Sequence, residues 1–142
     1  MRLVVDASIG IKWFKEENEK NVDLAINLLR LQLENKIELV VPDLFFYEVL
    51  NILLVKTNFD LQDTQLSLDK LIKLNMDIIH PDEKVMFSAL NISKSINLTF
   101  YDSLYLSIAQ NFNAMLVTDD KKILQNKNTY VFIRNLEELM GK

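Results

Sequence analysis

The sequence predicts an α/β fold in which a parallel sheet is covered by helices on both faces. Short runs rich in Val, Ile and Leu alternate along the chain with longer stretches of helical period. The short runs show no polar alternation, which is typical of strands buried on both faces of a parallel sheet. The chain has 142 residues, the size of one domain, so we expect a single domain over residues 1–142.

Five short apolar segments are expected to form the strands of this sheet. Each is bounded by residues that begin or end a helix or turn, and Pro42 stops the second strand. The five segments are Leu3–Val5, Ile37–Val41, Met76–Ile79, Ala114–Val117 and Tyr130–Ile133. Because helices separate them, we expect them to run parallel and the helices to outnumber the strands.

The stretches between the strands have helical period. Helices are expected near residues 8–16, 20–35, 44–57, 60–74, 82–96 and 101–112. Asp43 stands where the N-cap of the third helix is expected, and Pro81 and Asp82 are expected to open the fifth helix. Apolar spacing predicts the buried faces of three of these helices. They are Val22, Ala25, Ile26, Leu29 and Leu33 in 20–35, Leu61, Leu68, Leu71 and Ile72 in 60–74, and Val85, Ala89, Ile92 and Ile96 in 82–96.

The composition excludes several classes of site. There are no cysteines, which removes disulfides, thiolate zinc sites and a cysteine nucleophile. The apolar runs are too short to span a bilayer, and the early acid Asp6 does not fit a signal peptide, so we expect a cytoplasmic protein without a membrane partner. The net charge is −4, whereas proteins that bind nucleic acids by charge alone are usually basic.

Acidic residues stand at the ends of predicted strands and the starts of predicted helices. Asp6 directly follows the first strand, and Asp119 and Asp120 follow the strand that ends at Val117. Glu48 and Asp102 lie early in helices, within very apolar stretches. Carboxyl ends of parallel strands share one edge of a sheet, where open α/β folds bind ligands. We therefore expect these carboxylates to converge.

Each acid also has a simpler interpretation. Asp6 could cap the helix that follows it, and Asp102 could be favoured by the dipole at its helix N-terminus. Glu48 could lie on a narrow solvated face, and one of Asp119 and Asp120 could cap a short helix at 121–124. Taken singly these signals are weak, but a lone buried charge is costly and needs a partner. As a set, the acids are harder to explain by capping alone.

A convergent set of carboxylates favours one kind of chemistry. Oxygen ligands without His or Cys select hard cations, so Mg²⁺ or Mn²⁺ fits better than zinc. The only histidine, His80, precedes Pro81 at an expected strand end and is interpreted as structural. Metal-assisted phosphoryl chemistry is then the natural reaction class, and a bridging metal would offset the negative charge of the protein at a phosphate.

Four ordered motifs carry the acids, at residues 4–14, 41–51, 99–105 and 116–121. Together they resemble the motifs of PIN-domain proteins of the VapC toxin type. The first runs from Val4-Val5-Asp6-Ala7-Ser8 to Lys12-Trp13-Phe14. On the sequence alone, Lys12 is a charge on a helix, and Trp13 and Phe14 are expected in the core. The last contains a Thr-x-Asp pattern that selects Asp120 over Asp119. No single motif is specific, whereas the ordered set spans nearly the whole chain.

The resemblance implies a Rossmann-like α/β/α three-layer sandwich and an endoribonuclease that depends on Mg²⁺ or Mn²⁺. Carried over by position, the acidic site would be Asp6, Glu48, Asp102 and Asp120, with Asp6 and Asp102 as the chief metal ligands. Ser8, Asn51 and Thr118 would orient carboxylates or water, and Asp119 would be a neighbour of the ligands. For Ser8, a capping or turn hydrogen bond is an equally good interpretation.

The resemblance also implies partners. The substrate would be RNA, and a VapB-type antitoxin would cover the site. Proteins of this type often form homodimers, and the helices at 44–57 and 60–74 could supply the surface. Three alternatives remain: a non-catalytic PIN scaffold, a receiver-type signalling domain, and a haloacid-dehalogenase-type phosphatase. The last needs an aspartate at position 8, where this chain has Ser8.

Overall fold

Five parallel strands form one sheet at the centre of the molecule. In the computed structural model, which describes residues 1–141, the strand order is β3-β2-β1-β4-β5, and every neighbouring pair is parallel. The strands are β1 (Arg2–Val5), β2 (Glu38–Pro42), β3 (Asp77–Ile79), β4 (Met115–Val117) and β5 (Ile133–Arg134). The predicted parallel α/β fold is confirmed.

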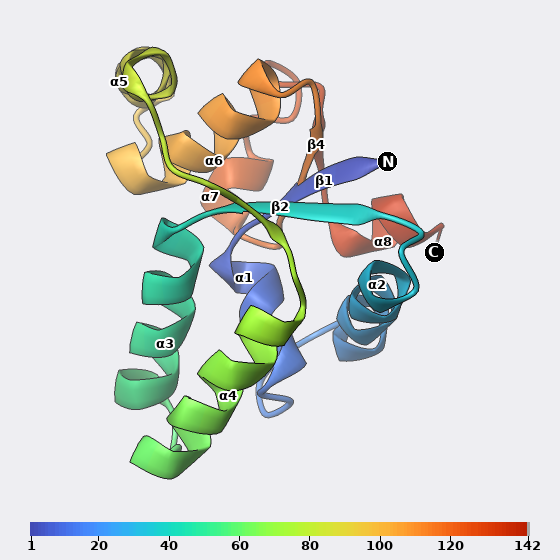
Figure 1. Cartoon of the computed structure of the whole chain (residues 1–142). Coiled ribbons are helices and arrows are strands. Elements are labelled where there is room, and N and C mark those ends of the chain that lie inside the picture. The colour runs from blue at the N-terminus through green and yellow to red at the C-terminus, as the bar shows by residue number, and fades with distance from the viewer. Residues whose placement is uncertain (142) are drawn as a thin grey trace.

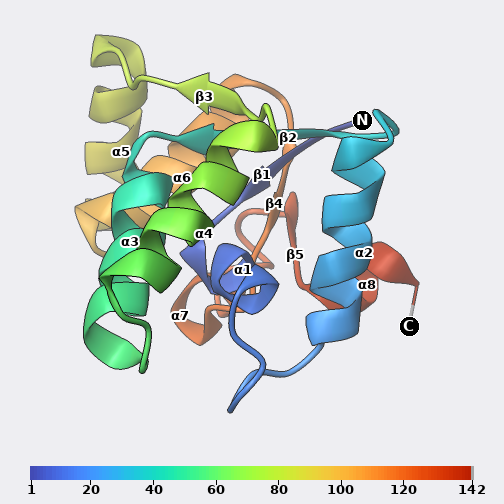
Figure 2. The same cartoon turned by 60° about the horizontal axis from the view of Figure 1, so that its bottom comes forward.

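Helices cover both faces of the sheet. They are α1 (Ala7–Gly10), the 3₁₀ helix η1 (Ile11–Trp13), α2 (Val22–Leu33), α3 (Leu44–Lys56), α4 (Leu61–Lys73), α5 (Glu83–Ile96), α6 (Phe100–Asn111), α7 (Lys121–Leu124) and α8 (Leu136–Met140). Helices α5 and α6 lie on one face, and α1 to α4 lie on the other (Figure 1). The second view shows α8 beside α2 (Figure 2). No helix within residues 1–141 is long and apolar enough to cross a membrane.

The centre of the sheet determines where the acidic residues meet. Strand β1 lies between β2 and β4, and Val5 is in register with Val117. Leu3, Val4 and Val5 are fully buried, as expected for a strand covered on both faces. The chain leaves β1 toward β2 on one side and later returns to β4 on the other. Ligands bind at such a switch point in open α/β sheets, and the residue after Val5 is Asp6.

Local signals fix the helix starts. The Asp82 side chain accepts a hydrogen bond from the Val85 N–H at 2.9 Å, so Asp82 is the N-cap of α5. Asp43 is likewise the N-cap of α3. Asp60 and Asp63 form a capping box at the start of α4. Such caps satisfy N–H groups that have no partner within the helix.

Three expectations about the elements were wrong in detail. The helix expected near 8–16 is a four-residue α-helix followed by a 3₁₀ turn. The last strand is Ile133–Arg134, not Tyr130–Ile133. In α2, Ile26 and Leu33 are exposed, whereas Leu24 and Leu28 are buried. This helix carries apolar residues on several sides, so spacing alone did not select the face that contacts the sheet.

Helix α4 departs further from its predicted buried face. Leu71 is buried, but Leu61 and Ile72 are 68% and 59% exposed. The helix packs mainly against α3, and it leaves an apolar side uncovered.

Asparagines turn the chain at several helix ends. Asn35, Asn75 and Asn113 follow α2, α4 and α6 and have φ values of 57°, 52° and 51°. This left-handed conformation usually requires glycine, and asparagine is the side chain that tolerates it best after glycine. Each of these turns leads directly into a strand. The three asparagines therefore stand at the amino edge of the sheet.

Candidate functional site

Asp6 lies at the carboxyl end of the central strand and is almost completely buried, at 4% exposure. Its Oδ1 accepts hydrogen bonds from the Ser8 N–H at 3.1 Å and the Ser8 Oγ–H at 2.5 Å. Its Oδ2 accepts one from the Thr118 Oγ–H at 2.5 Å. Asp6 is the N-cap of α1, so the capping interpretation holds. The bond from Thr118, at the end of β4, shows that the carboxylate also contacts a second part of the sheet edge.

The environment of Asp6 opposes its negative charge. Burial raises the pKa of Asp6 to about 7, although the hydrogen bonds from Ser8 and Thr118 lower it. The charges of Asp120 and Glu48 raise it further. Within residues 1–141, no Lys or Arg forms an ion pair with Asp6. A buried carboxylate without a protein cation suits a site that receives a cation from solution.

Glu48 reaches the same region from α3. The Tyr105 hydroxyl donates a hydrogen bond of 2.6 Å to the Glu48 Oε1, and the Tyr105 side chain, on α6, is only 1% exposed. Burial raises the pKa of Glu48, the Tyr105 hydrogen bond lowers it, and the charges of Asp102 and Asp120 raise it. Tyr105 was not anticipated from the sequence, and it holds Glu48 in a fixed orientation.

Asp102 and Asp120 complete the set from two further helix starts. Asp102 is in the first turn of α6, and its N–H donates to the Thr99 Oγ at 3.1 Å. Burial raises the pKa of Asp102, and the charge of Asp120 raises it further. Asp120 caps α7, because its Oδ1 accepts from the Lys122 N–H at 2.8 Å. The helix cap expected from the aspartate pair is therefore Asp120 itself.

The four acids thus come from four separate segments and act on one another electrostatically. Glu48 and Asp120 influence Asp6, and Asp102 and Asp120 influence Glu48. As the side chains stand, no three Asp, Glu or His residues within 1–141 are close enough together to bind one ion. The four carboxylates therefore influence one another's charge, but within residues 1–141 they form no closed set of ligands. Their donor atoms are all oxygen, which fits Mg²⁺ or Mn²⁺.

A match to a family model identifies the family of this chain. The model of the PIN domain matches residues 3–128. This chain belongs to the PIN-domain family. The assignment confirms the resemblance inferred from the motifs, and it removes the receiver-type and phosphatase alternatives. No curated protein matches the chain significantly.

Solved structures share the fold of this PIN domain at low sequence identity. A protein from Pyrobaculum aerophilum is 21% identical, with a TM-score of 0.70 and coverage of 99% of this chain and 96% of the other. VapBC2 from Rickettsia felis, bound to a DNA fragment from its promoter, is 18% identical, with a TM-score of 0.70 and coverage of 95% of this chain and 98% of the other. VapC20 from Mycobacterium tuberculosis, a toxin that cleaves the sarcin–ricin loop, is 10% identical, with a TM-score of 0.66 and coverage of 87% of this chain and 94% of the other. These similarities show the three-layer fold.

Of the residues expected to support the acids of the PIN domain, two contact an acid directly and one does not. Ser8 and Thr118 both hydrogen-bond Asp6, and the Thr118 Oγ also accepts the Asp120 N–H at 3.0 Å. Asn51 is exposed on α3, and no hydrogen bond in the described chain joins its side chain to the acids. Its supporting role stays a prediction. His80 is exposed near Asp43, apart from the four acids.

Lys12 is the residue whose environment differs most from its sequence interpretation. It is a buried ammonium, not a charge on a solvated helix face, with a side-chain exposure of 5%. Its Nζ lies 3.2 Å from the Glu19 Oε1 and 3.4 Å from the Asp119 Oδ2. Asp119 is therefore ion-paired with Lys12, which separates it in role from Asp120. Trp13 is buried as expected.

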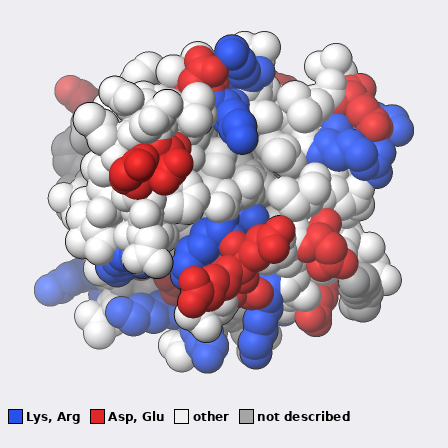
Figure 3. Space-filling model, turned by 90° about the horizontal axis from the view of Figure 1, so that it is seen from below, with Lys and Arg blue, Asp and Glu red and all other residues white. Residues whose placement is uncertain are grey.

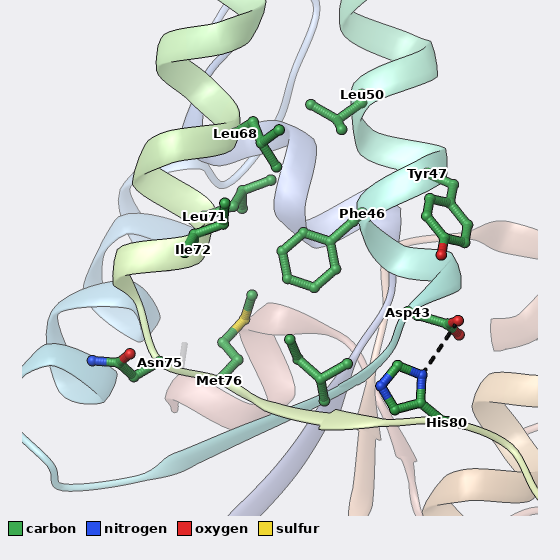
Figure 4. A pocket seen from close by; sticks show the side chains of 11 residues that line it. Asp43, Phe46, Tyr47, Leu50, Leu68, Leu71, Ile72, Asn75, Met76 and His80 are labelled. Carbon is green, nitrogen blue, oxygen red and sulfur yellow. Dashed lines mark ion pairs between the residues drawn. The ribbon is translucent and has the colours of Figure 1, made fainter.

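An apolar hollow lies on the α3–α4 side of the PIN domain. It has a volume of about 480 Å³. Phe46, Leu68 and Met76 surround it between the two helices and β3, and Asp43 and His80 stand at one end, 3.5 Å apart (Figure 4).

The face seen from below carries acidic and basic side chains side by side (Figure 3). Charge on that face is mixed, so it offers no broad basic surface to nucleic acid.

Proposed function

We propose that this PIN domain is a metal-dependent endoribonuclease and the toxin of a VapBC-type toxin–antitoxin pair. The proposal is supported by the mutual electrostatic influence of Asp6, Glu48, Asp102 and Asp120, and by a buried Asp6 carboxylate that pairs with no Lys or Arg within residues 1–141. Family membership and the shared fold of VapBC proteins support a nuclease toxin in general. The sarcin–ricin-loop cleavage by VapC20 supports RNA as the substrate class.

The four acids would hold Mg²⁺ or Mn²⁺, with Asp6 and Asp102 as the chief ligands. When bound, such a metal lowers the pKa of water and neutralises charge on a scissile phosphate. The chain supplies the orientation of the carboxylates. Ser8 and Thr118 fix both oxygens of Asp6, and Tyr105 fixes Glu48. Groups that orient metal ligands in this way commonly change affinity or activity 10- to 100-fold when they are removed.

Substitution of the acids tests the proposal. Asp6→Asn and Asp102→Asn are each expected to abolish cleavage of a structured RNA in Mn²⁺ or Mg²⁺, because each removes a ligand charge while keeping the side-chain shape. EDTA should abolish cleavage by the native protein. The measurement is gel analysis of RNA fragments, with circular dichroism to confirm the fold.

Asp77→Asn is a matched control, since Asp77 pairs with Arg2 at 2.5 Å, away from the four acids. It should keep full activity. Full activity in both Asp6→Asn and Asp102→Asn would contradict the proposal. A native protein that binds Mn²⁺ and RNA but cleaves nothing would instead support a non-catalytic PIN scaffold.

A further inference from the structure

Lys12 combines deep burial with two hydrogen bonds and two ion pairs. Its ammonium donates hydrogen bonds to the Lys20 carbonyl at 2.7 Å and to the Glu19 carboxylate at 3.2 Å. It forms ion pairs with Glu19 and with Asp119, whose Oδ2 lies 3.4 Å from the Lys12 Nζ. A buried charge is tolerated only when it is well paired. The ammonium is therefore held in one place by its two acidic partners and one carbonyl.

Asp119 connects Lys12 to the edge of the sheet through its other contacts. Its other oxygen, Oδ1, lies 3.4 Å from the Leu136 N–H, which donates to it at the start of α8. Its own N–H donates to the Ser8 Oγ at 2.9 Å. The two residues on either side are Thr118, which donates to Asp6, and Asp120, which caps α7. Residues 118–120 are thus anchored at Asp119 to three other segments of the chain.

We propose that Lys12 is a positioning residue for the metal site. It holds Asp119, and through Asp119 it fixes Thr118 and Asp120 in place relative to Asp6. Glu19 and Asp119 neutralise the ammonium, so Lys12 leaves the Asp6 carboxylate available to a metal. The inference rests on the proposed function, because it concerns the affinity of the same four acids for a divalent cation.

Binding of Mn²⁺ alone tests this role without any substrate. Dissociation constants would be measured by calorimetric titration for the native protein, Lys12→Met, Asp119→Ala and the double variant. Lys12→Met should bind Mn²⁺ about tenfold more weakly, the usual effect of losing a group that orients ligands. Asp119→Ala should lose a similar factor. The double variant should be no weaker than either single variant, because the two residues act through one link.

Lys15→Met is the matched control. Lys15 also pairs with Glu19, at 3.7 Å, but it does not pair with Asp119. Its Mn²⁺ affinity should stay within about twofold of the native value, since it lacks the link to the ligands. Thermal unfolding of the metal-free variants separates stability from affinity. If the ion pair were purely structural, its loss would lower the melting temperature and leave Mn²⁺ binding unchanged.

Three results would decide against the inference. Unchanged Mn²⁺ affinity in folded Lys12→Met overturns it, and tighter binding would show that Lys12 competes with the metal for Asp119. If Lys12→Met does not fold, unchanged affinity in Asp119→Ala overturns it. Failure of the native protein to bind Mn²⁺ is distinct, because it removes the proposed function itself.

Discussion

Asp6 serves two purposes with one carboxylate. It ends a fully buried strand and caps the helix that follows, and these tasks occupy its oxygens with hydrogen bonds from Ser8 and Thr118. The same burial disfavours its charge. At this position, helix capping and the proposed metal binding are therefore compatible. The cap orients the carboxylate, and no Lys or Arg within residues 1–141 pairs with it.

The raised pKa of Asp6 predicts an unusual pH dependence of stability. The folded pKa is about 7 and the ordinary value is 3.8, so between these values the folded chain holds a proton that the unfolded chain has lost. The free energy of unfolding contributed by Asp6 should fall as pH rises through this window. It should be lowest above pH 7, where the buried charge costs a few kcal/mol.

Urea unfolding in EDTA at pH 5 and pH 8 measures this effect. Asp6→Asn is the control, because an amide does not titrate. The native protein should lose more stability than Asp6→Asn between the two pH values. Equal losses in both proteins would show that Asp6 is not desolvated in the metal-free state.

The positions of three of the acids at the ends of elements could be predicted because their signals are local. Asp6, Asp102 and Asp120 stand at a strand end and two helix starts, positions that the spacing of apolar residues reveals. Lys12 and Tyr105 could not be found in this way. Each depends on a partner far along the chain, Asp119 and Glu48, and only the completed sheet brings these pairs together.

At the scale of elements, the close contact between α1 and α3 depends on Gly10. A Cβ atom there would lie 2.5 Å from the Phe45 Cζ and 3.1 Å from the Val49 Cγ2. Phe45 and Val49 are fully buried, so they have little room to move. The helix pattern at 8–16 was visible in the sequence, but this contact and the change to a 3₁₀ turn were not.

Gly10→Ala should therefore destabilise the protein, despite the better helix propensity of alanine. Overpacking of a dense core typically costs about 1–3 kcal/mol. Asn91→Ala, on the exposed side of α5, is the control and should be neutral or slightly stabilising. Chemical denaturation measures both. Unchanged stability in Gly10→Ala would mean that α1 and α3 can separate without cost.

At the scale of the whole molecule, apolar side chains gather on the outer side of α3 and α4. Val55 is 69% exposed and Ile72 is 59% exposed, and the apolar hollow lies between the same helices. Exposed apolar side chains in such numbers commonly mark an interface. The spacing of apolar residues identified α3 and α4 but not which apolar side is exposed, because an interface and a core contain the same residue types.

We expect this side to join two copies of the chain. Sedimentation velocity should give a mass near twice the 16.6 kDa of one chain. Val55→Lys and Ile72→Lys should each shift the protein toward monomer, because a charge would be buried at the contact. Leu33→Lys is the control, since Leu33 is 60% exposed on α2. A monomeric native protein, or equal effects of all three substitutions, would contradict this expectation.

The asparagine turns have a consequence for how the protein can change over generations. Asn35, Asn75 and Asn113 turn the chain at the amino edge of the sheet, whereas the four acids face its carboxyl edge. A substitution at one of these turns alters the stability of a helix end and leaves the acids untouched. A turn residue can therefore be exchanged without changing any side chain at the carboxyl edge. Tolerance of substitution and the proposed chemistry thus belong to opposite edges of one sheet.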